Sequence, residues 1–163
     1  FPDVGVRSGR FHHGEVLDEM FSGMSSRLFE RVREERGMAY FVGASRMVGL
    51  DLGMFSFYAG THPEQVEAVY DEINAEVERV RAGRIDADEL RHCRTRLKAA
   101  KRMGLQTPGA RAIDAALSVL YGESPNAWRD YPEKIDAITI GDLVTFATEY
   151  LDPARRLELV VRP

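Results

Sequence analysis

The sequence has 163 residues, of which 44% are apolar and 29% are charged, and this is the composition of an ordinary globular domain. Its net charge of −4 at pH 7 argues against a nucleic-acid partner, which usually leaves a basic footprint. No run of 18 apolar residues occurs, so no membrane span is predicted, and the length fits a single domain over residues 1–163.

The first nine residues, Phe1 to Gly9, carry neither an initiator methionine nor a signal-peptide pattern. They read as the continuation of an earlier segment, so we expect a fragment of a longer polypeptide whose first strands precede Phe1. The single cysteine, Cys93, cannot form an internal disulfide and is expected to be a core thiol. This is compatible with a reducing compartment, and we favour a cytoplasmic location in a protein of bacterial type.

Two helices are predicted at the start of the chain. Residues 10–21 place their apolar side chains on one side of a helix. Ser25 or Ser26 can cap a second, short helix, and Gly37 ends it, as glycine often does just beyond a helix C-terminus.

The pattern then changes to that of strands. Residues 39–48 and 52–60 are rich in aromatic and small apolar residues and are separated by a short turn at 49–51, so a β-hairpin is predicted. Because the second strand has large apolar side chains on both faces, we expect both faces to be covered.

The remainder of the chain is mainly helical. Thr61 and Glu64 have the spacing of a capping box and predict a helix start. Helical patterns follow over residues 66–82, from about 86, around 113–121, over 128–135 and over 140–151. Alternation over residues 157–161 predicts a final strand. This order of elements predicts an α+β fold, an antiparallel sheet with helices packed on one face.

The segment from His12 to Glu15 is the first candidate for chemistry. His12 and Glu15 are three positions apart, so on a helix they share a face and could touch one metal ion. Catalytic zinc needs three protein ligands and an open position, and neither His62 nor His92 repeats the spacing. We therefore interpret the pair as polar residues at the start of an amphipathic helix, and we predict no metal site in this chain.

Signatures of other catalytic sites are missing. Ser25, Ser26 and Cys93 are potential nucleophiles, but no G-x-S-x-G pattern and no evident base accompany them. No phosphate-binding glycine loop is present either. We predict no catalytic residue in this chain.

Arg33 and Tyr40 are candidate ligand-binding residues. Arg33 falls in the last turn of the second helix and Tyr40 at the start of the next strand, so both could project over the same sheet edge. A guanidinium fork and a phenol are suited to holding peptide carbonyl oxygens, and an exposed edge accepts an extended peptide. The alternative is that residues 33–40 are merely a charged, solvated helix end.

The stretch GMSSRLFERVREERGMAY, residues 23–40, closely resembles the signature of the C-terminal half of pitrilysin-type, or insulinase-type, inverted zincins. That family includes insulin-degrading enzymes, mitochondrial processing peptidase and bacterial processing proteases. Met38 stands where leucine is common. GTHPEQVEAVYDEI, IDADELRHCRTRLKAA and AITIGDLVTFATEYLDPARRLELVV are similar to later family segments, so the resemblance spans almost the whole chain.

The resemblance implies the substrate-binding, non-zinc half of a zinc metallopeptidase. Family members pair a half that carries a His-x-x-Glu-His zinc helix with a half that binds substrate through an Arg and a Tyr seven residues apart. Arg33 and Tyr40 match that pair, whereas the segment from His12 to Val16 lies roughly where the zinc helix would be and lacks its second histidine. The implied partners are a homologous zinc-bearing domain or subunit and an extended peptide substrate, with zinc in the partner half.

A second hypothesis is a non-proteolytic structural homologue, similar to the core subunits of respiratory complexes in the same superfamily. The presence of both Arg33 and Tyr40 favours the peptidase, because a purely structural subunit has no chemical need for the pair. A third hypothesis, an unrelated α+β binding module, would require a long chance match.

Overall fold

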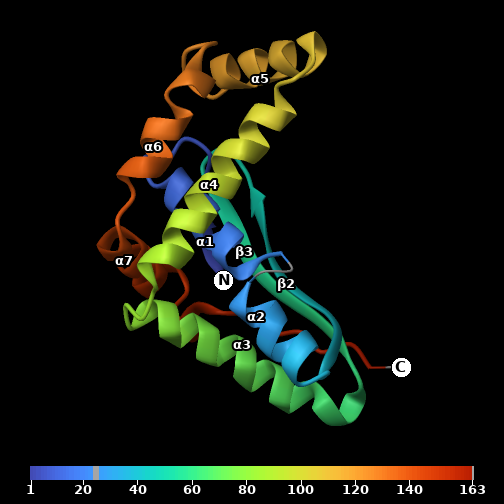
Figure 1. Ribbon diagram of the computed structural model, residues 1–163. Helices are drawn as coiled ribbons and strands as arrows, with labels where there is room; N and C mark the ends of the chain where they lie inside the picture. Colours follow the sequence, from blue (N-terminus) through green and yellow to red (C-terminus); the bar gives the residue numbers. More distant parts are fainter. Residues whose placement is uncertain (24–25, 163) are drawn as a thin grey trace.

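The computed structural model describes residues 1–23 and 26–162 and has the predicted fold, an antiparallel sheet with helices packed on one face (Figure 1). The strands lie in the order β1-β3-β2. They are β1 (Pro2–Val4), β2 (Ala39–Val48) and β3 (Leu52–Thr61). The α-helices are α1 (Phe11–Phe21), α2 (Arg27–Phe29), α3 (Val66–Arg81), α4 (Ala87–Gly104), α5 (Pro108–Leu120), α6 (Tyr131–Ala137) and α7 (Ile140–Tyr150).

Side-chain caps fix the starts of two helices, and the first of these caps was predicted. The backbone N–H of Phe29 donates to Ser26 Oγ over 3.2 Å at the start of α2, while Ser25, the other candidate cap, lies outside the described residues. Thr139 and Asp142 form a capping box at the start of α7. Each such cap typically contributes about 1 kcal/mol to helix stability.

The capping box predicted at Thr61 and Glu64 is wrong. The Thr61 hydroxyl instead donates to the carbonyl oxygen of Met38 on the facing segment of chain. The chain then makes a 3-10 turn, Pro63–Gln65, before α3 begins. Because the Thr61 hydroxyl donates across the hairpin, it does not cap the helix as the local spacing predicted.

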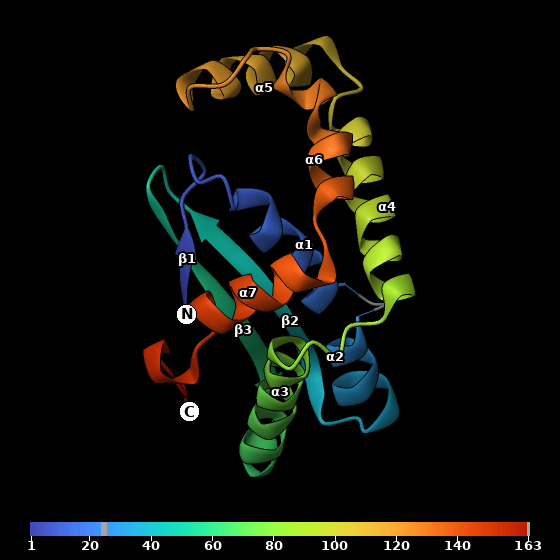
Figure 2. The same ribbon diagram turned by 90° about the vertical axis from the view of Figure 1, so that its left-hand side faces the viewer.

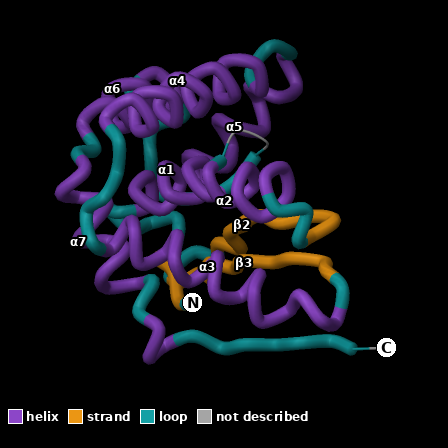
Figure 3. Tube along the Cα trace, turned by 60° about the horizontal axis from the view of Figure 1, so that its bottom comes forward, coloured by secondary structure: helices purple, strands orange, loops and turns teal. Residues whose placement is uncertain are grey.

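The elements at the two ends of the chain differ from those predicted. At the start, where no strand was predicted, Pro2–Val4 forms β1 and pairs antiparallel with residues 52–54 of β3. The strand predicted over residues 157–161 does not form, and Leu157 is 92% exposed. This tail runs beside α3 (Figure 3), where Arg156 donates to Asn74 Oδ1 over 3.0 Å. The alternating pattern is therefore present without a strand partner in the described part of the chain.

The main core lies between the sheet and helices α1 and α7. Its members with no exposed surface include Val16, Leu17, Phe55, Ile135, Leu143 and Phe146. Cys93 belongs to this core, as predicted, and burial raises the pKa of its thiol to about 11. A smaller cluster lies beneath α2 and the start of β2 and consists of Leu28, Val32, Ala39, Val42 and Val69. We call it the lower cluster.

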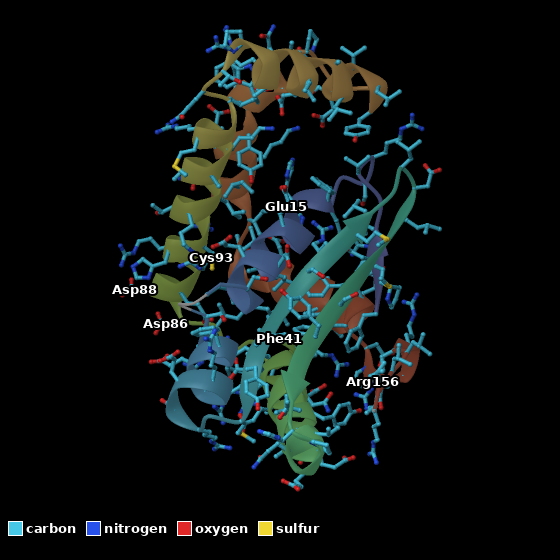
Figure 4. The ribbon with its side chains drawn as sticks, turned by 90° about the vertical axis from the view of Figure 1, so that its right-hand side faces the viewer. Glu15, Phe41, Asp86, Asp88, Cys93 and Arg156 are labelled. Carbon is cyan, nitrogen blue, oxygen red and sulfur yellow. The ribbon has the colours of Figure 1, made fainter. Side chains whose placement is uncertain are left out.

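The outward face of the hairpin is open, so the expectation that both faces are covered is wrong for the described chain. Phe41, Met47, Met54 and Tyr58 are exposed there, and Figure 4 shows this face towards the viewer with Phe41 on it. The inward-facing residues Val42, Ala44 and Phe55 are buried, whereas nothing in the described chain covers the outward face.

Helices α4 and α6 lie side by side and carry α5 away from the sheet (Figure 2). The apolar residues Ile113, Leu117 and Leu120 of α5 are exposed. No helix in the described part of the chain combines the length and the apolar character that crossing a membrane needs.

Candidate functional site

Arg33 lies on a short π-helical turn that continues directly from α2. This turn, Glu30–Glu35, is followed by Gly37, whose φ of +57° lies in the left-handed region that glycine adopts without steric cost. The backbone N–H of Met38 then donates to Val32 O over 2.8 Å and closes the turn. Single π-helical turns often occur at functional sites.

The Arg33 side chain is exposed and braced by an aromatic ring. Its guanidinium carbon lies 5.0 Å from the centre of the Phe29 ring, one turn earlier on the same side. Within the described part of the chain Arg33 forms no ion pair, whereas the neighbouring Arg31 and Arg36 both pair with Glu72. The donors of Arg33 are therefore available to another molecule.

Tyr40 occupies a β-bulge at the start of β2. Ala39 faces Thr61 and Phe41 faces Gly60, so Tyr40 is the extra residue between two consecutive partners. A bulge re-aims the side chain it carries and is common next to active sites. Tyr40 is 65% exposed.

The Tyr40 hydroxyl has a neighbour that the sequence analysis did not single out. Its oxygen lies 2.7 Å from His62 Nε2, and the two ring centres are 5.3 Å apart. The register of a hairpin centred near residue 50 does bring residue 62 opposite the start of β2, but the contact depends on the bulge, which leaves no clear mark in the sequence.

Arg33 and Tyr40 each follow a residue that is buried in the lower cluster. Val32 precedes Arg33 and Ala39 precedes Tyr40, and both are buried in that cluster. No hydrogen bond joins Arg33 to Tyr40 in the described chain. Their relative position is set by the packing of Val32 and Ala39 in the lower cluster and by the closed turn at Gly37. The packing of the backbone thus fixes where the two side chains begin, while the guanidinium and the hydroxyl both face solvent.

An ion-pair network around two buried carboxylates, Glu72 and Glu76, joins this segment to α3. Arg31 reaches Glu72 over 2.9 Å and Glu76 over 3.3 Å, and Arg36 reaches Glu72 over 2.5 Å. Glu76, whose side chain is 1% exposed, also pairs with Arg79 of its own helix over 2.8 Å. Buried carboxylates paired in this way resist movement, because separating them leaves a charge without a partner.

His12 and Glu15, the first candidate for chemistry, contact each other. His12 Nδ1 lies 2.6 Å from Glu15 Oε2, and the imidazole packs edge-on against Tyr131 at 5.5 Å between ring centres. The pair lines a cavity of ≈ 480 Å³ between α1 and the α4–α6 helices, well apart from Phe41 in Figure 4. His62 contacts Tyr40 instead, and no group of three potential metal ligands comes together among the described residues. The residues that the structure brings together here do not fit a zinc site.

The family model described as the peptidase M16 inactive domain matches residues 13–97. The chain belongs to this family. The resemblance to pitrilysin-type zinc peptidases is thereby confirmed. The chain is 30% identical over 151 residues to an uncharacterized zinc protease of Streptomyces coelicolor, a match that covers 93% of this chain and 33% of that protein.

Solved structures share the fold of this M16 inactive domain. A protease from Helicobacter pylori superposes with a TM-score of 0.81 at 23% identity, covering 93% of this chain and 36% of that one. A chain of complex III2 from Candida albicans superposes with a TM-score of 0.78 at 21% identity, covering 91% and 38%. The chain thus spans about a third of the length of each of these three proteins.

Proposed function

We propose that this M16 inactive domain is the substrate-binding half of a zinc-dependent endopeptidase and that Arg33 and Tyr40 hold an extended peptide. The proposal rests on two exposed side chains above the lower cluster: an arginine that has no carboxylate partner among the described residues, and a tyrosine in a β-bulge. Relatives that bear the name zinc protease support it.

The chemistry of the two groups suits peptide carbonyl oxygens. A guanidinium offers several donors in a fixed fork, and a phenol offers one more. Preset donors of this kind orient a peptide and stabilise charge that develops on a carbonyl oxygen. Because no group of three potential metal ligands comes together in the part of the chain that the structure describes, the metal and its activation of water would belong to a homologous domain or subunit. On this proposal residues 1–163 form the single non-zinc domain of that assembly.

Arg33→Ala and Tyr40→Phe are each expected to lower kcat/KM of the complete peptidase by about ten-fold or more. A hydrogen bond that involves a charged group is worth about 1.5–3 kcal/mol, and ten-fold corresponds to about 1.4 kcal/mol. The measurement is steady-state hydrolysis of a fluorogenic peptide by the enzyme containing each variant.

Two matched variants serve as controls. Arg91, an exposed arginine on α4, and Tyr58, an exposed tyrosine on the outward hairpin face, lie outside the proposed pair. Arg91→Ala and Tyr58→Phe should leave kcat/KM within about two-fold of the parent enzyme. If Arg33→Ala and Tyr40→Phe also leave it unchanged, the pair does not hold the substrate.

A second candidate function is that of a non-proteolytic subunit, favoured by the structural similarity to a chain of complex III2. It predicts that an assembly purified with this chain hydrolyses no peptide, with or without added zinc. It also predicts that Arg33→Ala changes nothing but local stability. The kinetic series above distinguishes the two.

A further inference from the structure

The position of His62 is fixed from both sides by backbone contacts. Before it, Thr61 pairs with Ala39 across the hairpin. After it, the backbone N–H of Gln65 donates to His62 O over 2.9 Å and starts the 3-10 turn. Although the imidazole is exposed, its attachment point is held between a paired strand and a closed turn. The 2.7 Å contact with Tyr40 therefore joins two anchored residues.

The direction of this hydrogen bond decides what the Tyr40 hydroxyl can do. A phenol has one proton to donate and accepts through its oxygen. If His62 Nε2 is unprotonated, it accepts the hydrogen bond that the phenol donates, and Tyr40 has no proton left to donate to a substrate. If Nε2 carries a proton, it donates to the phenol oxygen, and the phenol proton is free for a carbonyl oxygen.

We propose that His62 is the positioning residue for Tyr40 and donates Nε2–H to its hydroxyl, so that Tyr40 donates to a carbonyl oxygen of the bound peptide. The inference rests on the proposed function. Two hydrogen bonds in series, from imidazole to phenol and from phenol to carbonyl, polarise each other, so each strengthens the other. In the described chain the Tyr40 hydroxyl has no other hydrogen-bond partner, which makes His62 the group that sets its orientation.

The test is a double-mutant cycle in the complete peptidase, read as kcat/KM. His62→Leu removes the donor and keeps an apolar side chain of comparable size, and we expect a loss of about five-fold, as for one neutral hydrogen bond. His62→Gln places an amide N–H near the former Nε2, and we expect activity within about two-fold of the parent. In the Tyr40→Phe background, His62→Leu should cause no further loss, because the hydroxyl it orients is gone.

Each other result contradicts the inference in a recognisable way. If Tyr40→Phe lowers kcat/KM but His62→Leu does not, His62 has no role and the proposed function stands. If His62→Leu lowers it equally in the parent and in the Tyr40→Phe variant, or His62→Gln is as poor as His62→Leu, the effect is not donation to the phenol. If Tyr40→Phe itself leaves kcat/KM unchanged, both the inference and the proposed role of Tyr40 in holding the substrate are wrong. His92→Leu, at an exposed histidine of α4, is the matched control and should leave kcat/KM unchanged.

Discussion

Replacing Asp3 by alanine is expected to lower the free energy of unfolding by about 3–5 kcal/mol, because it leaves a buried guanidinium without its counter-charge. Arg46 holds Asp3 with two hydrogen bonds, 2.6 Å from Nε to Oδ2 and 3.2 Å from Nη2 to Oδ1. The Arg46 side chain is 5% exposed and that of Asp3 is fully buried. Chemical denaturation followed by circular dichroism measures the change.

Two companion variants separate the buried charge from a general effect of mutation. Arg91→Ala breaks an ion pair of exposed side chains, Arg91 with Asp88, and should change stability by less than about 1 kcal/mol. The double variant Asp3→Ala/Arg46→Met removes both charges and should be less destabilised than Asp3→Ala alone. If Asp3→Ala lowers the free energy of unfolding no more than Arg91→Ala does, the buried ion pair does not stabilise the fold.

Gly14→Ala is expected to destabilise the protein by about 2 kcal/mol or more, although helix propensity alone predicts that this change stabilises a helix. In an ordinary helix this change gains up to about 1 kcal/mol. Here a Cβ at residue 14 would lie 2.4 Å from the guanidinium of Arg46, which is held by Asp3 and by the carbonyl oxygen of Phe11. Because these partners fix Arg46, the methyl group has to displace the ion pair or the helix.

Gly104→Ala on α4 is the matched control for this change. Nothing lies within 4 Å of a Cβ at residue 104, so the variant should be neutral or slightly stabilised. Thermal unfolding of both variants under the same conditions makes the comparison. Equal effects of the two substitutions would show that Arg46 does not restrict α1.

Local patterns predicted most of the fold because they act within one element. Helical periodicity, the serine that caps α2 and the glycine after the π-helical turn need no distant partner. The strand at Pro2–Val4 and the ion pair between Asp3 and Arg46 depend on residues more than 40 positions apart, so no local pattern marked them. The same reason accounts for the strand expected over residues 157–161, where the pattern is right and the partner is missing from the described chain.

The candidate site was predicted in part for similar reasons. Arg33 and Tyr40 lie within one motif, and their residue types and spacing pointed to them. His62 meets Tyr40 only through the hairpin register and the bulge, which a single sequence does not specify. The absence of a carboxylate beside Arg33 in the described chain likewise appears only once Arg31 and Arg36 are seen to take Glu72.

The most direct test of the central claim is peptide hydrolysis by three samples: this chain alone, the zinc-bearing half alone, and the two together. Our account predicts that this chain alone is inactive, with or without added zinc, and that efficient hydrolysis needs both halves. Hydrolysis by this chain alone on addition of zinc, or full activity of the zinc-bearing half without it, would contradict the assignment of a substrate-binding, non-zinc domain.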